Sequence, residues 1–355
     1  MASLRDVAER AGVSVATASR VANGSAAVRE ETRERVESAM RELLYVPPAR
    51  IEPSSAVGLF VPEFGNPVFA ALAEAMEAYA TRAGLATILC NTHGSAQREL
   101  DYVRMLLERR VEGMVFISAE ITDVRGKHSH YAKLLDRGAR LVFVNGGPEE
   151  LEVTSVGVDE RAAGRIATEH LVQLGHERIG FVAGSAYALP TREKSLGRTD
   201  ALRGAGLADG LVAHAAFSVD GGRAALRQLL DRPRAERPTG VICSSDLMAI
   251  GALQEAASAG LDVPGDLSVV GFDGIDAAAW TQPPLTTVEQ PIEEIARTAV
   301  TALRAQVERP VERQPSYVFR PRLRVGGTTA PPSSSARSTS SKSSKGSKAI
   351  PSVER

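Results

Sequence analysis

Two histidines separated by one residue, His128 and His130 in the segment KHSHY, come nearest to a metal-binding pattern in this sequence. Imidazole nitrogens bind zinc and other transition metals, but a site needs further Cys, His, Asp or Glu ligands. No cysteine or acidic cluster lies beside these histidines in the chain. We therefore interpret them as solvated loop residues and predict no metal site. The two cysteines, Cys90 and Cys243, lie in apolar contexts and are interpreted as buried free thiols.

Motifs for the common catalytic and cofactor sites are absent from the sequence. The chain has no GxxxxGK[ST] phosphate loop, no GxGxxG after a strand, no GxSxG nucleophile elbow and no HExxH zinc motif. Each of these motifs supplies backbone amides, a nucleophile or metal ligands to a reaction centre. Their absence predicts a protein that binds its ligands without catalysis and without a cofactor.

Composition indicates a soluble chain with more than one domain. The 355 residues are 43% hydrophobic and 24% charged, and the usual domain size predicts about two domains. No apolar run approaches the roughly 18 residues that a membrane span needs, and the N-terminal segment MASLRDVAER carries charges where a signal peptide would be apolar. We expect a cytoplasmic protein with no membrane partner. The formal net charge of -1 gives no global indication of nucleic-acid binding.

Short apolar runs alternate with amphipathic helical segments over about 57–328. The runs are VGLFVP, ATILC, GMVFIS, RLVFVNG, RIGFVAG, GVICSSD and LSVVGFD. This alternation predicts doubly wound parallel sheets with helices on both faces. Because the strands outnumber those of one compact sheet, we predict lobe 1 at about 57–157 and 288–317, and lobe 2 at about 158–287 and 318–328. A ligand of such a fold binds at the carboxyl ends of the strands, in the cleft between the lobes.

The N-terminal segment, 1–45, predicts an all-α helix-turn-helix. Helices are expected over about 4–11, 15–22 and 30–44. Ser3 and Ser14 are placed to cap the first two helices, and Gly12 supplies the tight turn between them. By helical periodicity alone, an ordinary three-helix domain whose arginines face solvent explains the segment equally well.

Longer motifs in both parts resemble the LacI/GalR family of bacterial transcription regulators. The runs DVAERAGVSVATASRVANG and VREETRERVESAMRELLYVP are similar to that family's DNA-binding head. The runs HLVQLGHERIGFVAG, SSDLMAIGAL, VVGFDG and PPLTTVEQP are similar to its two-lobed, periplasmic-binding-protein-like core. The resemblance implies a homodimer whose heads place their second helices in successive major grooves of a pseudo-palindromic DNA operator. It also implies a small effector that binds between the lobes and changes operator affinity.

The same resemblance implies which head residues contact DNA. Val15 and Ala16 would touch thymine methyl groups, and Arg20 would bind a guanine through two hydrogen bonds. The positions that the family uses for the phosphate backbone or for register are Ser14, Thr17, Ser19, Asn23 and Thr32. For Thr17 and Ser19, helix capping or packing is the alternative interpretation.

The linker between head and core, 46–56, is shorter than the family's hinge, whose helix inserts a leucine into the minor groove. Pro48 stands where the family has an asparagine, and Pro53 follows too soon for a stable helix. We expect a weakened minor-groove contact, with Arg50 or Ile51 as the inserting residue.

The effector site is also implied by the resemblance. Arg192 matches the family's ligand-clamping arginine and Asp273 its hydroxyl-binding acid, and together they suit a polyhydroxylated ligand such as a sugar or a nucleoside. Phe69 and Trp280 can stack on a ring of the ligand. The remaining candidates are Asn91, His93, Asn145 and Ser245, of which the first three could equally hold loops by local hydrogen bonds. For Arg192 and Asp273, the alternative is an ion pair between the lobes.

The C-terminal segment, 329–355, is rich in Ser with interspersed Lys, and we predict a disordered tail. It has no leucine heptads, so a dimer is expected and not a coiled-coil tetramer. We expect an effector-responsive repressor. The alternatives are a solute-binding protein without a DNA function, which the head disfavours, and an enzyme, which would need a nucleophile or cofactor loop that the sequence lacks.

Overall fold

The chain is organised as two units, Met1–Ser54 and Ser55–Arg355, in the computed structural model. The structure describes residues 3–22, 28–43, 45, 56–148, 150–308 and 314–333. The predicted hinge residues Arg50 and Ile51, and the predicted phosphate contact Asn23, lie outside these described residues.

The first unit is the predicted three-helix head, with α1 (Leu4–Ala11), α2 (Val15–Ala22) and α3 (Glu30–Glu42). The Ser3 side chain caps α1 through a capping box with Asp6, and Gly12 ends this helix in the left-handed conformation, with φ 64°. Arg35 of α3 donates to the carbonyl oxygens of Ala11 and Gly12 at 2.5 and 3.3 Å. The turn between α1 and α2 is therefore fixed from both sides. The buried core of the head consists of Val7, Ala8, Ala11, Ala18, Val21, Val36 and Ala39.

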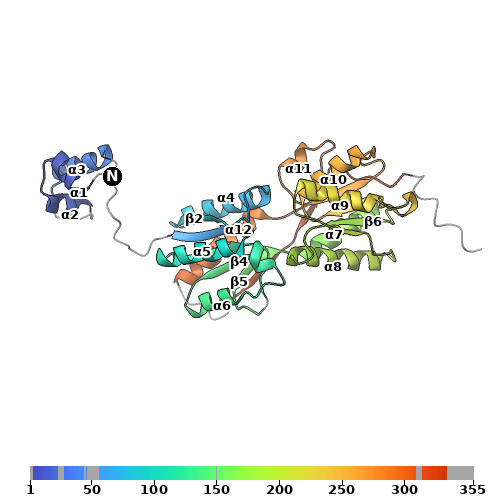
Figure 1. Ribbon diagram of the computed structural model, residues 1–355, viewed down its shortest axis with the longest axis horizontal. Helices are drawn as coiled ribbons and strands as arrows, with labels where there is room; N and C mark the ends of the chain where they lie inside the picture. Colours follow the sequence, from blue (N-terminus) through green and yellow to red (C-terminus); the bar gives the residue numbers. More distant parts are fainter. Residues whose placement is uncertain are drawn as a thin grey trace, which may run out of the picture. The chain divides into compact units, whose positions relative to one another are not determined.

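Lobe 1 of the second unit is a six-stranded sheet in the order β11-β5-β4-β3-β1-β2, with every neighbouring pair parallel. Its strands are β1 (Ala56–Val61), β2 (Ala86–Asn91), β3 (Gly113–Ile117), β4 (Leu141–Val144), β5 (Thr154–Val158) and β11 (Ser316–Phe319). Helices α4 (Pro67–Arg82) and α12 (Ile292–Glu308) contribute to the core on one face, and α5 (Ala96–Glu108) and α6 (Ser129–Asp136) to the core on the other. The short helix η1 (Ala119–Thr122) follows β3. Figure 1 shows the resulting layers of helix, sheet and helix.

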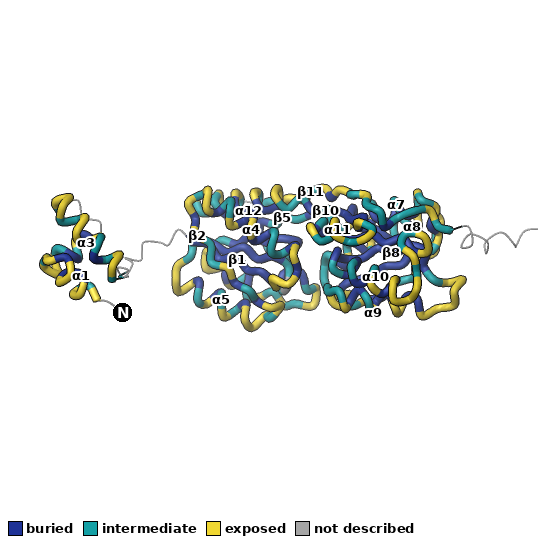
Figure 2. The backbone as a smooth tube through the Cα atoms, turned by 90° about the horizontal axis from the view of Figure 1, so that it is seen from above, coloured by how far each residue is buried: buried dark blue, intermediate teal, exposed yellow. Residues whose placement is uncertain are grey.

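Lobe 2 repeats this architecture in the order β12-β10-β9-β8-β6-β7. Its strands are β6 (Ile179–Ala183), β7 (Val212–His214), β8 (Gly240–Cys243), β9 (Ser268–Asp273), β10 (Thr286–Glu289) and β12 (Arg322–Arg324). Its helices are α7 (Glu160–Gln173), α8 (Leu189–Gly204), α9 (Val219–Leu230), η2 (Arg234–Glu236), α10 (Asp246–Ser258) and α11 (Ala277–Trp280). Figure 2 shows the central strands of both lobes as buried. The prediction of doubly wound parallel sheets is confirmed, except that β12 runs antiparallel to β10 because the chain returns from β11 with a short connection and no helix.

The chain crosses between the lobes three times, after β5, after β10 and after β11. These crossings lie within a few residues of the predicted ones. Apolar contacts also join the lobes, because Val68 of α4 is buried in the core of lobe 2, and Phe69 and Ile292 pack against the cores of both lobes. No helix among the described residues is long and apolar enough to cross a membrane.

The C-terminal end of the core extends further than predicted. The tail was expected to begin at 329, but Thr329 hydrogen-bonds to His170 at 3.0 Å, and Ala330 is bonded through its N–H to Ser268 at 3.0 Å and through its carbonyl to His176 at 2.9 Å. These partners lie in lobe 2, so side-chain hydrogen bonds hold a segment whose composition alone predicted disorder. The rest of the predicted tail, from 334 on, lies outside the described residues.

Candidate DNA-binding surface and effector cavity

The second helix of the head presents the three predicted base-reading residues on one exposed surface. Ala18 and Val21 are buried in the head core and so fix the rotation of α2. This rotation leaves Val15, Ala16 and Arg20 exposed, with 46% of the Val15 surface accessible. An exposed apolar side chain beside an exposed arginine, at the start of a recognition helix, suits contact with base edges in a major groove.

Ser14 acts as the cap of α2. Its hydroxyl accepts a hydrogen bond from the Thr17 backbone N–H at 3.1 Å and lies 2.9 Å from the Thr17 hydroxyl. The capping interpretation therefore applies to this pair in the described structure, and phosphate contacts by Ser14 and Thr17 stay a prediction. Ser19 and Thr32 are partly exposed, so both are accessible in part to a phosphate group.

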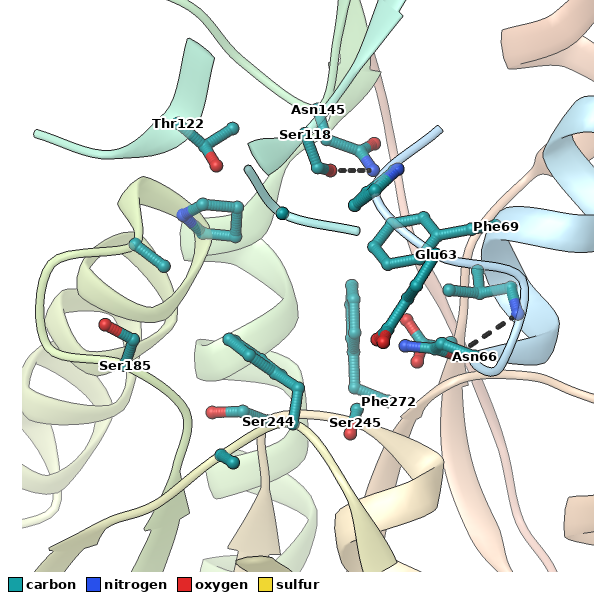
Figure 3. Close-up of a pocket in the computed structure, with 18 of the residues that line it drawn as sticks. Glu63, Asn66, Phe69, Ser118, Thr122, Asn145, Ser185, Ser244, Ser245 and Phe272 are labelled. Atoms are coloured by element: carbon teal, nitrogen blue, oxygen red, sulfur yellow. Dashed lines mark hydrogen bonds between the residues drawn. The ribbon is translucent and has the colours of Figure 1, made fainter. Parts of the chain in front are cut away.

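A cavity of about 490 Å³ lies between the lobes of the core. Five of the predicted effector residues line it, namely Phe69, His93, Asn145, Ser245 and Asp273. They come from the carboxyl ends of strands and from the helix starts that follow, as the doubly wound fold requires. Figure 3 shows Phe69, Asn145 and Ser245 around this space.

Three predicted effector residues are not brought to this cavity. Trp280 lies on the short α11 with 77% of its surface exposed. Arg192 lines a separate cavity of about 760 Å³. Asn91 accepts a hydrogen bond from the backbone N–H of His93 at 3.2 Å, which is the loop-holding role given as its alternative. The predicted pairing of Arg192 with Asp273 around one ligand is therefore not supported by this arrangement.

Lys194 is the cationic residue that the sequence analysis missed. It lines the cavity, is only 4% exposed, and forms an ion pair with Glu160, the first residue of α7. Its amino group also lies 3.6 Å from the centre of the Phe272 ring. The helical spacing of α8 holds the signal for this placement, since Thr191, Lys194, Arg198 and Leu202 are buried at steps of three and four whereas Arg192 is exposed.

Two glycines bring α7 and α8 close enough for this ion pair. A Cβ atom on Gly164 would collide with the backbone carbonyl of Lys194, and one on Gly197 would collide with the carbonyl of Arg161. The two helices therefore touch backbone to backbone. This contact holds Lys194 and Glu160 at the wall of the cavity.

Asp273 ends β9 in a strained conformation, with φ 123°, and is nearly buried. Its carboxylate accepts a hydrogen bond from the Gln290 amide at 2.8 Å. Burial, and then the nearby carboxylate of Asp246, hold the pKa of Asp273 well above its usual value. Asp246 lies beneath the cavity wall and accepts hydrogen bonds from Thr287 and from the backbone amides of Gly274 and Ile275 at 2.6 to 2.9 Å.

Two buried amide oxygens at the cavity have no hydrogen-bond partner among the described residues. They are Oδ1 of Asn145 and Oε1 of Gln290, and both residues line the cavity. The Asn145 amide nitrogen is already used, because it donates to the Ser118 hydroxyl at 3.1 Å. Buried polar atoms are almost always paired in native proteins. A ligand whose hydroxyl groups donate hydrogen bonds would pair both oxygens.

Aromatic rings and carboxylates make up much of the remaining cavity wall. Phe69, Phe217 and Phe272 contribute their rings, and Figure 3 shows those of Phe69 and Phe272 facing the cavity. The carboxylates are those of Glu63, Glu120, Asp123, Glu160 and Asp273. Among the described lining residues Lys194 is the only lysine or arginine, and Glu160 already neutralises it. Ring faces with many acceptors suit an uncharged polyhydroxylated ligand and disfavour an anion.

Known proteins match both units. Residues 3–48 match the bacterial regulatory proteins of the lacI family, and residues 168–329 match the periplasmic binding protein-like domain. An uncharacterised HTH-type transcriptional regulator from the aml 5' region of Streptomyces limosus is 42% identical over 334 residues, which covers 92% of this chain and 94% of that protein. The chain belongs to the lacI family.

Solved structures of this family cover nearly the whole chain as well. The complex of the transcriptional regulator CelR with cellobiose has a TM-score of 0.70 and 32% identity, and it covers 92% of this chain and 100% of that one. The lac repressor dimer bound to operator and to the anti-inducer ONPF has a TM-score of 0.77 and 26% identity, and it covers 93% of this chain and 99% of that one. This lacI-family protein is thus a DNA-binding transcriptional regulator. Members of its family are regulators and not enzymes.

Proposed function

We propose that this protein is a homodimeric repressor whose operator affinity is changed by an uncharged oligosaccharide bound between the lobes. The observation that carries the effector assignment is the pair of unpartnered acceptors, Asn145 Oδ1 and Gln290 Oε1, beside aromatic rings and Asp273 in one cavity. The cavity volume of about 490 Å³ falls within the range of small-molecule sites, roughly 300 to 1,000 Å³. The likeness to CelR, which was solved with cellobiose, supports a ligand of two sugar rings.

On DNA, Arg20 is the residue proposed to select a base, through two hydrogen bonds to a guanine. Val15 and Ala16 would contact thymine methyl groups, because small apolar side chains cannot form hydrogen bonds to base edges. The likeness to the lac repressor dimer on its operator supports two such helices reading a pseudo-palindrome. A weak minor-groove contact by Arg50 or Ile51 remains part of the proposal.

The experiment is selection from a randomised double-stranded DNA pool, followed by retesting of the enriched sites with Arg20→Ala. We expect a palindrome whose half-sites contain a guanine, and we expect Arg20→Ala to lose preference for that guanine at a cost of about 1 to 3 kcal/mol. Arg104→Ala is the matched control, because Arg104 is an exposed arginine of the core and its loss changes the net charge equally. An unchanged preference in Arg20→Ala would remove Arg20 from base recognition.

The recovered operator then serves to screen effectors. Maltose, cellobiose and longer neutral glucans are compared with glucose 6-phosphate and with purine bases, and operator affinity is measured with each. The proposal expects a response to a neutral oligosaccharide and none to the phosphate ester. A response to the phosphate ester or to a purine alone would overturn the proposed effector class.

A further inference from the structure

A short strap of backbone and side-chain contacts joins the two lobes beside the cavity. We define the strap as Asp123, Val124 and Arg125 of lobe 1 with Tyr187 and Ala188 of lobe 2. Asp123 and Ala188 form an isolated antiparallel bridge. The Val124 N–H donates to the Tyr187 carbonyl oxygen at 3.0 Å. The lobes are thus joined here without a covalent crossing of the chain.

Side chains reinforce the strap from its outer side. The Arg125 guanidinium lies 4.0 Å from the centre of the Tyr187 ring. Asp123 holds this guanidinium in place by accepting hydrogen bonds from Nε at 3.0 Å and from Nη2 at 2.7 Å. Tyr187 is 49% exposed and Val124 is 40% exposed, so water reaches these contacts. One backbone hydrogen bond and one exposed cation–π contact make a weak connection that opens far more readily than the sheets.

The strap separates two spaces. Asp123, Tyr187 and Ala188 line the central cavity, whereas Asp123 and Val124 also line the second cavity, the one that contains Arg192. Thr122 and Asp123 border both cavities. When the strap parts, the two spaces therefore join.

The segments on either side of the strap are turns and carry no regular structure that would resist its movement. Gly126 follows Arg125, and its N–H donates to the Asp123 carbonyl in a tight turn at 2.9 Å. On the other side, the Ala188 N–H donates to the Ser185 carbonyl at 3.1 Å, immediately before α8 begins. Each half of the strap can thus move by rotation within a turn.

We propose that the strap is a gate through which the effector reaches the central cavity, with Arg125 and Tyr187 as the residues that set how often it opens. This inference rests on the proposed effector cavity. The Arg125–Tyr187 contact spans the lobes and touches the strap from outside, so its loss weakens the closed state while the cavity wall keeps Asn145, Lys194, Asp273 and Gln290. Exchange of the effector would then become faster with little change in affinity.

The test measures access to the cavity without any sugar. Ser244 lines the cavity and is 2% exposed, and Ser244→Cys places a thiol there. The native thiols leave little background, because Cys90 and Cys243 are both buried and burial raises the pKa of each, that of Cys90 to about 12. The probe is fluorescein maleimide, and the unsubstituted chain gives the background rate.

We expect Arg125→Ala and Tyr187→Ala, each added to Ser244→Cys, to raise the labelling rate about two- to fivefold, which corresponds to the loss of one exposed cation–π contact. Because both changes remove the same contact, the double change should be no faster than either alone. Arg104→Ala, the exposed control, should leave the rate unchanged. Equal labelling rates in all four backgrounds would overturn the gate.

Hydrogen exchange of the Val124 amide gives a second measurement on the chain without Ser244→Cys. Arg125→Ala should reduce protection of this amide by the same factor as it raises labelling, and unchanged protection would contradict the gate. Neither measurement uses an effector, so a failed sugar screen would overturn the proposed effector class and leave the gate to be decided by labelling and exchange. If cellobiose binds, Arg125→Ala should raise its association and dissociation rates together.

Discussion

Lys194 and Glu160 form an ion pair between α8 and α7, and the Lys194 amino group lies 3.6 Å from the centre of the Phe272 ring at the end of β9. The pair thus connects two helices of lobe 2 to the wall of the cavity. Burial raises the pKa of Glu160 even though the charge of Lys194 opposes this effect. The carboxylate is therefore ionised only because the lysine is present.

Replacement of Lys194 by Met should abolish the response to the effector and destabilise the fold. The change leaves a buried carboxylate without its partner, which costs about 3 to 5 kcal/mol when a buried pair is broken. The double variant Lys194→Met/Glu160→Gln should recover most of the stability but not the effector response. Urea unfolding and operator binding with and without sugar measure the two effects. Arg192→Ala is the control, and a lost response in that variant would return the ligand-binding role to Arg192.

Replacement of Gly197 by Ala should destabilise lobe 2 and weaken effector binding. The added methyl group meets the Arg161 carbonyl and forces α7 and α8 apart, at a cost of about 1 to 3 kcal/mol. Gly204→Ala is a control in the same helix, because a Cβ there meets no atom within 4 Å. It should be neutral or stabilising, since alanine favours a helix. Thermal unfolding compares the two, and equal melting temperatures would contradict the close packing.

The stability of lobe 2 should fall with rising pH through Asp246. Burial raises the pKa of Asp246 from an ordinary 3.8 to about 7, although hydrogen bonds from Thr287, Ile275 and Gly274 lower it. Between these two values the folded chain holds a proton that the unfolded chain has lost, so the free energy of unfolding decreases as pH rises, by at most about 1.4 kcal/mol per pH unit. The contribution is complete below the lower value and is lost above the higher one.

Asp246→Asn tests this pH dependence, because the amide does not titrate. Relative to the unsubstituted chain, the variant should gain stability between about pH 5 and pH 8 and then keep a constant difference. Urea unfolding at several pH values measures this. A stability difference that does not change with pH would show that Asp246 is already ionised throughout this range.

Loss of the Ser14 hydroxyl should weaken operator binding by destabilising α2. The hydroxyl caps the helix through the Thr17 N–H, and removal of such a cap costs about 1 kcal/mol. Ser14→Asn should restore binding, because asparagine caps equally well, whereas Ser14→Ala should not. Operator affinity over a salt series measures the effect. If Ser14→Asn fails and the salt dependence falls by about one phosphate contact, Ser14 contacts a phosphate and the cap is secondary.

The sequence could predict those parts of the fold and site that depend on local signals. Ser3 and Gly12 mark the ends of α1 through capping chemistry, and the apolar runs mark buried strands. The position of Asp273 followed from the end of one such run. These residues were found because each lies at a boundary that the sequence itself displays.

The rest depended on helix rotation and on contacts far apart in the chain. Arg192 and Lys194 are two residues apart on one helix and therefore face different sides of it, which only the buried face of α8 reveals. Trp280 follows β9 closely in sequence, but α11 directs it to solvent. Gln290 escaped attention because its role depends on the pairing of β10 with β9.

The three crossings between the lobes determine when each lobe can be completed during synthesis. Lobe 1 begins at β1 but needs α12 and β11, which come from the last part of the core sequence. Lobe 2 likewise needs β12 at its sheet edge. Neither sheet can close while the ribosome still holds this segment. The head has all of its helices within the first residues of the chain and can fold well before either lobe, so a nascent chain carries a folded DNA-binding unit ahead of a core that cannot yet respond to sugar.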